Sequence, residues 1–471
     1  MTAFGRCPRE RRSTTKFIYA DPGLRNNHGH HAYYCRLITG ELRARGIEVV
    51  VLATSDVEGS LQAEVSARAH FRTWTYWCDT DPICGWLNTF HTAAELTRQD
   101  LALFADYHAD DILFWSSTMP PQFMGLVRWL SDIDPAIMPK VVVEFNNEPG
   151  LDPVAWPAGS VYRTRDPRTD GRAAFFRLAA GLIPKDTMRS LRLATFDRYC
   201  SVLYSELLGY RVGTLPPPYR ATGPVHSRSG KRPITIGDIG TQRLDKGYGL
   251  IPEVARLLLR ARSDIRILLH TSDPSWMPAE QEAVRKLATV DDRLVLDERV
   301  ADGETWPDII NNVDLMLCPY EPVRYHSSPS AVAFEAVANG IPLVGPKGSS
   351  LDRLIKSYGG CGATFEHFTP DSIAATTESV IDRFDEFAGL AMDAATQWAK
   401  RAGPSNMVNA MLALLGVGDG VAPTGGICLH DNVQVQITSN GGGVGSRHFS
   451  TMKSAAELYP RPIVGWKGNI S

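Results

Sequence analysis

The residues best placed to do chemistry lie in one stretch of sequence, from Asp314 to Pro346. It reads as a buried strand over 315–318, a polar loop over 319–327, a helix opened by Ser328 and Pro329, and a second buried strand over 341–344. The free N–H groups at such a helix start attract anions, and parallel sheets bind ligands where their strands end. Glu335 is the one acidic residue on this apolar helix, so we expect it either to hydrogen-bond a ligand or to be a partly solvated structural residue.

The run FEAVANGIPLV, which contains Glu335, resembles the E-A-x-A-x-G-x-P-x-V signature of retaining, nucleotide-sugar-dependent glycosyltransferases of family four, group 1. The resemblance implies α/β class and GT-B architecture, with two facing Rossmann-like doubly wound domains and a cleft between them. In that family the helix carries two glutamates separated by seven residues, the first toward the donor sugar and the second toward the nucleotide ribose. Glu335 matches the second, whereas Ser327 occupies the first position. The resemblance therefore assigns Glu335 to the catalytic site, and Ser327, Ser328 and Ser330 to the donor site.

A second motif belongs to the same resemblance. The run GTQRLDKG, which starts at Gly240, is similar to the family's G-x-x-R-x-x-K-G loop, whose cations neutralise the donor diphosphate. This implies that Arg243 and Lys246 bind the donor phosphates and stabilise the charge that grows on the leaving pyrophosphate. The alternative is that both are surface charges. Gly348 and Ser349, in a small-residue turn before a helix, could add backbone donors to the same site.

The loop that ends at Gly29 carries His28, His30 and His31 within four residues. It lacks a full G-x-G-x-x-G, so a dinucleotide fingerprint is not supported, but it resembles the family's first loop, which approaches the donor phosphates. Three interpretations of the histidines stay open: metal binding, an anion or acceptor contact by His30 or His31, and capping with packing. Metal binding is the weakest, because helix neighbours diverge and no matching ligand cluster is evident.

Asn146, Asn147 and Glu148 lie at the carboxyl end of a predicted strand over 140–147. In the family this strand often ends in a histidine that lines the active site, and the corresponding residue here is Asn146. A polar cluster at a strand's carboxyl end can bind a sugar. An asparagine-rich turn that hydrogen-bonds its own backbone is the alternative.

Strands and helices alternate in both halves of the chain, which predicts two doubly wound parallel sheets. In the first half a strand over 16–21, a helix over 30–45 and a strand over 47–54 form a βαβ unit. We expect these parts in order: a mobile leader (1–15), an acceptor domain (16–220), a linker (221–233), a nucleotide-sugar domain whose last helices cross back (234–415), and a Gly-rich tail that is disordered or loosely attached (416–471).

Composition excludes several classes of protein. The 471 residues include 49 Lys and Arg against 52 Asp and Glu, so no overall charge field recruits nucleic acid. Eight cysteines without C-x-x-C spacing, and no long apolar run, predict a reduced, cytoplasmic protein. Residues 163–198 hold nine basic and four acidic residues, which is compatible with peripheral contact with anionic lipid at the inner membrane face, or with a solvated helical face.

These patterns and the resemblance together predict an enzyme that transfers a sugar from a nucleotide diphosphate sugar to a glycan, a lipid-linked acceptor or another hydroxyl group. The family implies retention of the anomeric configuration, with the nucleotide sugar as co-substrate and no tightly bound cofactor or metal. Two alternatives stay open: a degenerate GT-B protein that binds glycans or partner enzymes, and a nucleotide-sugar epimerase on the same fold. The departures at Ser327 and Asn146 motivate the first of these.

Overall fold

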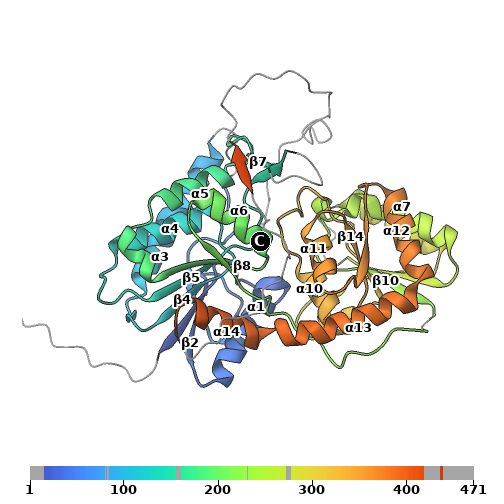
Figure 1. Cartoon of the computed structure of the whole chain (residues 1–471), viewed down its shortest axis with the longest axis horizontal. Helices are drawn as coiled ribbons and strands as arrows, with labels where there is room; N and C mark the ends of the chain where they lie inside the picture. The colour runs from blue at the N-terminus through green and yellow to red at the C-terminus, as the bar shows by residue number, and fades with distance from the viewer. Residues whose placement is uncertain are drawn as a thin grey trace, which may run out of the picture.

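The computed structural model describes residues 15–79, 81, 84–154, 161–230, 232–271, 277–417 and 435–438. Its two large sheets stand side by side, each covered by helices (Figure 1). The predicted leader lies outside the described residues except for residue 15, and so does most of the predicted tail.

The first sheet has seven parallel strands in the order β3-β2-β1-β4-β5-β8-β9. Its central strands are buried along their length, as expected for apolar runs covered on both faces. The strands are β1 (Lys16–Ala20), β2 (Glu48–Thr54), β3 (Ala67–Phe71), β4 (Ile112–Trp115), β5 (Lys140–Glu144), β8 (Leu191–Thr195) and β9 (Val212–Thr214).

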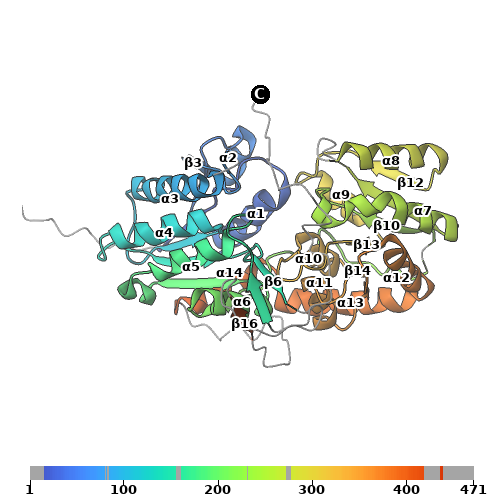
Figure 2. The same ribbon diagram turned by 90° about the horizontal axis from the view of Figure 1, so that it is seen from above.

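The described residues of this half form six α-helices and one 3-10 helix. Helices α3, α4 and α5 lie together on one face of the sheet, and α1 lies on the other side (Figure 2). The helices are α1 (Gly29–Ala44), α2 (Gly59–Val65), α3 (Gly85–Leu103), α4 (Pro120–Asp132), α5 (Arg172–Gly181), η1 (Lys185–Arg189) and α6 (Arg198–Leu208).

The second sheet has six parallel strands in the order β12-β11-β10-β13-β14-β15. Its strands are β10 (Ile234–Asp238), β11 (Ile265–His270), β12 (Leu294–Asp297), β13 (Leu315–Leu317), β14 (Leu343–Pro346) and β15 (Gly362–Phe365). Its helices are η2 (Leu244–Lys246), η3 (Tyr248–Leu250), α7 (Ile251–Ala261), α8 (Pro278–Val290), α9 (Thr305–Asn311), α10 (Ala331–Ala338), α11 (Ser350–Ser357), α12 (Pro370–Asp382) and α13 (Phe384–Arg401).

The last two helices of the described chain lead from the second half of the molecule back to the first. Helix α13 runs along the second half, and α14 (Pro404–Leu414) lies beneath the first half, where it packs on α1 (Figure 1). The Tyr34 hydroxyl contacts Met407 Sδ at 3.3 Å, and Arg45 donates to the Ser405 hydroxyl at 2.7 Å. One hydrophobic cluster therefore continues from α1 into α10, α13 and α14.

A third, small sheet joins part of the tail to the first half. The antiparallel pair β6 (Leu151–Pro153) and β7 (Val161–Thr164) is extended by β16 (Gln436–Thr438), which runs parallel to β7. Val435 and Ile437 pack against the core of the first half. This part of the predicted tail is therefore held by main-chain pairing and apolar contacts rather than loosely attached.

Several basic residues of the segment 163–198 point into the protein. Arg165 and Arg172 form ion pairs with the buried carboxylate of Glu148, at 2.7 and 2.6 Å. Arg192 donates to main-chain carbonyls, including that of Leu414 at 2.9 Å. The segment is thus less of an open cationic surface than its net charge indicates. Within the part of the chain that the structure describes, no helix is long and apolar enough to cross a bilayer.

Candidate active site between the two sheets

The loop after β10 brings its two cations close to α10. Gly240 has φ +101°, and a Cβ atom there would lie 3.2 Å from Val332 Cγ2 and 3.7 Å from Lys246 Nζ. Glycine therefore lets the main chain pass between the α10 start and the lysine. Val332 lies one turn before Glu335, so the two sequence motifs meet in space.

The Lys246 ammonium is partly buried, and little nearby negative charge offsets its own charge. Burial, followed by the charge of Arg243, lowers its pKa to about 8. Its Nζ lies 5.8 Å from the centre of the Tyr320 ring. The Arg243 guanidinium donates to Asp245 at 2.8 Å and to the Tyr325 hydroxyl at 3.3 Å. An anionic ligand would restore the full charge of Lys246, so the site is suited to phosphate.

Glu335 is 2 % exposed, and only one of its two carboxyl oxygens has a hydrogen-bond partner among the described residues. Its Oε2 accepts from Trp306 Nε1 at 2.9 Å, whereas its buried Oε1 makes no hydrogen bond with the described residues. Burial raises its pKa to about 8. The prediction of a partly solvated structural residue is therefore wrong. An unmet buried oxygen is what a hydroxyl group of a ligand would satisfy.

Another buried acid lies at the end of β10. Asp238 is 3 % exposed, and its Oδ2 has no hydrogen-bond partner among the described residues. Burial raises its pKa to about 7, and the charge of Lys246 opposes that shift. The sequence interpretation missed Asp238, although its place at a strand's carboxyl end was a usable signal.

The start of α10 differs from the prediction. Ser330, not Ser328, is the N-cap, and its Oγ accepts from the Ala333 N–H at 3.2 Å. Pro329 precedes the helix instead of opening it, because the serine next to the first helical residue takes the capping position. The carbonyl of Ser327 accepts from Cys200 Sγ at 2.8 Å, and that of Ser328 accepts from the Ser350 hydroxyl at 2.6 Å.

Gly348 and Ser349 are already engaged within the protein. The Gly348 N–H donates to Asp352 at 2.8 Å, and the fully buried Ser349 hydroxyl caps α11 and donates to the Pro346 carbonyl at 2.6 Å. Their assignment to the donor site stays a prediction, with less support than that of Lys246.

The N-terminal end of α1, in the first half, faces the loop that carries Arg243 and Lys246. Gly29 has φ +79° and opens the helix, with His28 as the N-cap residue. His30 is open to solvent yet has protein around it, and this partial desolvation, followed by the charges of His31, Lys246 and Arg243, lowers its pKa well below the usual value. His31 instead hydrogen-bonds to Asp21 and Tyr76. No group of three metal-ligating side chains suited to a metal ion occurs in the described ranges.

The polar residues after β5 divide into two kinds. Asn146 and Asn147 are half-buried, and the Asn146 amide donates to Ser117 at 3.1 Å and to Glu144 at 3.2 Å. Glu148 is buried under Arg165, Arg172 and, from the second half, Arg324. The asparagines stay candidates for sugar binding, whereas Glu148 joins the two halves.

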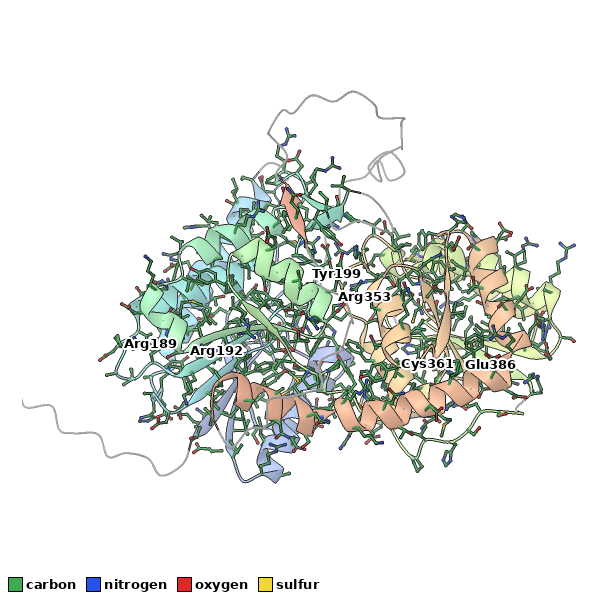
Figure 3. The ribbon with its side chains drawn as sticks, viewed as in Figure 1. Arg189, Arg192, Tyr199, Arg353, Cys361 and Glu386 are labelled. Atoms are coloured by element: carbon green, nitrogen blue, oxygen red, sulfur yellow. The ribbon has the colours of Figure 1, made fainter. Side chains whose placement is uncertain are left out.

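A second contact between the halves lies beside α6. Figure 3 shows Tyr199 and Arg353 next to each other at this boundary. The Arg353 guanidinium lies 4.4 Å from the centre of the Tyr199 ring and donates to Asp197, which also caps α6. The sequence offered no local signal for either contact, because each joins residues more than 150 positions apart.

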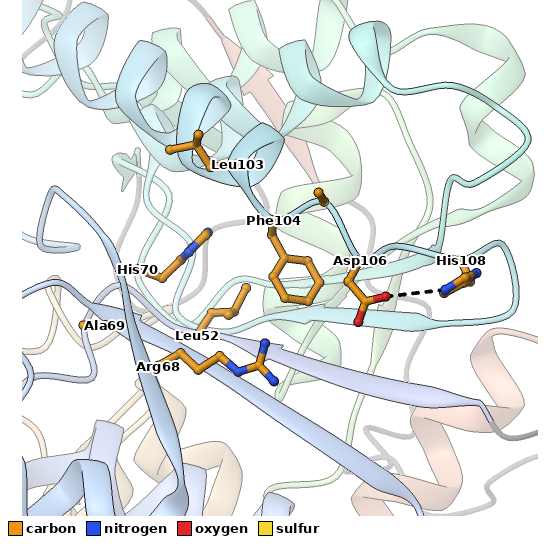
Figure 4. Close-up of a pocket in the computed structure, with 9 residues that line it drawn as sticks. Leu52, Arg68, Ala69, His70, Leu103, Phe104, Asp106 and His108 are labelled. Carbon is orange, nitrogen blue, oxygen red and sulfur yellow. Dashed lines mark ion pairs between the residues drawn. The ribbon is translucent and has the colours of Figure 1, made fainter. Parts of the chain in front are cut away.

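One pocket lies away from these residues. It measures about 540 Å³ and opens at the edge strand β3, lined by Arg68, His70, Leu103, Phe104 and Asp106 among others (Figure 4). Asp106 pairs with His108 at 3.5 Å there. None of the residues predicted from the sequence for the site line it.

Comparisons with known proteins place the fold. No family model matches the chain, and no curated protein sequence matches it. HepE from Anabaena, solved with UDP and glucose, superposes with a TM-score of 0.55 at 12% identity, over 85% of this chain and 99% of HepE. Sucrose-phosphate synthase from Thermosynechococcus elongatus gives 0.59 at 13% identity, over 85% and 98% of the two chains.

The chain has the GT-B fold. The fold class predicted from the sequence is thus confirmed. A protein assigned as a UDP-N-acetylglucosamine 2-epimerase from Listeria monocytogenes is similar too, with a TM-score of 0.52 at 12% identity over 85% of this chain and 96% of its own. At such identities the likeness concerns the fold, and the activity must be argued from the site.

Proposed function

We propose that this GT-B protein transfers a glycosyl group from a nucleotide diphosphate sugar, held by the second half, to a hydroxyl group of an acceptor held by the first half. The observation that carries the proposal is the meeting of two motifs at Gly240: Lys246 Nζ borders it from one side, and Val332, one turn before Glu335 on α10, borders it from the other. A ribose hydroxyl would satisfy the unmet oxygen of Glu335, and a diphosphate would compensate the Lys246 ammonium.

In this proposal Lys246 and Arg243 neutralise the diphosphate and stabilise the charge that develops on its leaving oxygen. Glu335 anchors the nucleotide. The acceptor, a glycan or a lipid-linked sugar, would enter from the side of His30, Asn146 and Asn147. We propose retention of the anomeric configuration on the strength of the resemblance of both motifs to the retaining family. No divalent metal is needed, because the two basic side chains take its electrostatic role.

The test is a panel of nucleotide diphosphate sugars, with binding followed by calorimetry and products identified by mass spectrometry and NMR. We expect one donor to bind, a sugar to be transferred, and excess chelator to leave the rate unchanged. Loss of transfer in chelator with recovery on adding Mn²⁺ would contradict the metal-free mechanism. The anomeric proton coupling of the product decides between retention and inversion.

The epimerase is the second candidate, favoured by the similarity to the Listeria protein. It predicts release of free nucleotide or an epimerised sugar without any acceptor. Donor binding without turnover would instead support a glycan-binding or partner-binding protein that has lost catalysis.

A further inference from the structure

A chain of hydrogen bonds starts from a carboxylate buried beneath the start of α1. Asp21 follows β1 directly and is fully buried. His31, in the first turn of α1, places Nδ1 at 3.0 and 2.9 Å from the two Asp21 oxygens. Its Nε2 lies 3.2 Å from the Tyr76 hydroxyl, on the loop after β3. Residues from three separate segments thus meet at the carboxyl end of the first sheet.

The main chain is shaped around this imidazole. A Cβ atom at Gly23 would lie 2.1 Å from His31 Cε1, so the turn after β1 accepts no side chain there. The Gly23 N–H also donates to Asp21 Oδ1 at 2.8 Å. The ring is therefore held in one orientation by packing as well as by its hydrogen bonds.

The acceptor character of Asp21 sets the direction of every proton along the chain. Its oxygens accept from the Gly23 N–H and lie within hydrogen-bond distance of His31 Nδ1, so a neutral imidazole here would carry its proton on Nδ1 and present a lone pair at Nε2. The Tyr76 hydroxyl would then donate to His31 Nε2, which is nearer to it than His30 Nε2 at 3.5 Å, and burial raises the pKa of Tyr76 well above the usual value, which keeps that proton in place.

The Asn147 side chain lies beside Tyr76 and, as a donor toward its oxygen, opposes part of the rise in the Tyr76 pKa. The amide of Asn147 must therefore turn its nitrogen toward Tyr76, because the Tyr76 oxygen has become the acceptor. The same nitrogen contacts Met119 Sδ at 3.4 Å. With its nitrogen engaged there, the amide oxygen is the remaining acceptor of this side chain. An asparagine whose orientation is ordinarily ambiguous is thus fixed by a carboxylate three hydrogen bonds distant.

Its neighbour Asn146 is fixed in the same sense by a second buried carboxyl group. The Asn146 nitrogen donates to Glu144 and Ser117, and its oxygen is buried and makes no hydrogen bond with the described residues. Glu144 is fully buried and also accepts from the Tyr34 hydroxyl at 2.6 Å. Two adjacent amides at the end of β5 therefore turn their donors inward and keep their acceptors for a ligand.

We propose that the Asn146 and Asn147 amide oxygens form an acceptor pair that binds hydroxyl groups of a neutral sugar acceptor, and that Asp21, His31, Tyr76 and Glu144 are positioning residues for it. This inference rests on the proposed function and deepens it by naming the acceptor chemistry. Two carbonyl oxygens favour ligands that donate hydrogen bonds, and they disfavour phosphate or carboxylate groups, which only accept.

The proton order can be tested without any activity. In protein labelled with ¹⁵N-histidine, the His31 signals are assigned by their loss in His31→Gln. We expect the nitrogen shifts of a neutral ring protonated at Nδ1. A ring protonated at Nε2 would overturn the inference whatever the enzyme does, because Tyr76 would then be the acceptor of the histidine proton.

The role of the pair is tested in the transfer assay with Tyr76→Phe, using the acceptor found in the product screen and its monodeoxy analogues. Loss of one neutral hydrogen bond should raise the acceptor KM roughly 3- to 10-fold and reduce the preference for the hydroxyl-bearing acceptor, with the donor KM unchanged. Tyr107→Phe is the matched control, because it removes a buried tyrosine hydroxyl on the other face of the sheet, where that hydroxyl has no hydrogen-bond partner among the described residues.

Three outcomes are distinguishable. An unchanged acceptor KM and preference in a folded, donor-binding Tyr76→Phe variant defeats the acceptor pair but leaves the glycosyltransferase proposal intact. A wild-type protein that binds no nucleotide sugar and transfers nothing defeats the proposed function, and the role of the pair with it. Tighter binding of acceptors that carry a phosphate or carboxylate at the recognised position would also overturn the inference.

Discussion

The two halves of the molecule present opposite kinds of polar group where their sheets face each other. In the second half, Glu335 and Asp238 each keep a buried oxygen that makes no hydrogen bond with the described residues, and Lys246 has a lowered pKa. In the first half, Asp21 and His31 satisfy each other and their neighbours in one continuous chain. Under the proposed function, a charged ligand completes the first arrangement, whereas the second is already ordered and suits a neutral one. Charge compensation and pre-orientation are thus divided between the halves.

The sharpest way to test this division is to remove the lysine. Lys246→Ala should lower kcat by roughly 10²- to 10³-fold, the scale of losing one preorganised contact to developing charge, while donor affinity falls less. Steady-state kinetics with saturating acceptor, together with donor titration, measure both quantities. A variant with full kcat would remove Lys246 from the chemistry.

Substitution of Glu335, the proposed anchor of the nucleotide, should change the kinetics in a different manner. Glu335→Gln keeps an oxygen for Trp306 but replaces the carboxyl oxygen offered to the ribose, so it should raise the donor KM about 10-fold and change kcat less. Gln281→Ala, whose residue lies on α8, serves as a control for changes to a buried polar residue. Abolished turnover with unchanged donor binding would show that Glu335 acts at the reacting sugar instead.

The dependence of donor binding on pH follows from the lysine. With a pKa of about 8, Lys246 loses its charge as the pH rises from 7 to 9, and a bound diphosphate would raise that pKa. Binding therefore takes up a proton above pH 8, and affinity should fall up to about tenfold per pH unit there. Calorimetry in buffers of different ionisation enthalpy counts the protons. Lys246→Arg should flatten the profile, and a wild-type profile that is already flat would contradict the mechanism.

The thermal stability of the protein should show the cost of burying the Glu335 carboxyl group. The Glu335 pKa of about 8 in the folded state exceeds the unfolded value of about 4.3, so the folded protein binds the extra proton and loses stability as pH rises between these values. At pH 8.5 Glu335→Gln should therefore raise the Tm by about 2 to 4 °C, and at pH 4 by less. Equal shifts at both pH values would point to packing rather than ionisation.

The smallest effect is expected at the ion pair that joins the halves. Arg324→Ala removes one of three arginines from Glu148, and the other two stay in place. The donor KM should rise about 2- to 3-fold, with kcat and the acceptor preference unchanged. Arg168→Ala, which affects only an exposed pair with Asp166, is the control. A larger effect in Arg324→Ala would mean that contact between the halves limits catalysis.

The sequence predicted the fold well because local patterns determine it. Apolar runs such as those of β1 and β10 could only be buried parallel strands, and the Gly240 loop and the Glu335 helix are contiguous motifs. The α10 start was misplaced by two residues, because Ser328 and Ser330 are both acceptable N-caps and only tertiary contacts decide between them. The roles of His31, Asn146 and Asn147 could not be derived, because Asp21, Tyr76 and Glu144 reach them through the fold rather than through spacing.

Because α14 packs on α1, the first half can complete its fold only after the C-terminal helices have been synthesised. Tyr34 and Met407 are separated by 373 positions, and both belong to one apolar cluster with Met411. Until the ribosome has released residue 411, α1 therefore exposes apolar surface that no earlier segment covers, although the first sheet's own strands were completed near residue 214. The first half is synthesised early but gains its last helix late. It is therefore the part of this chain with most need of a chaperone.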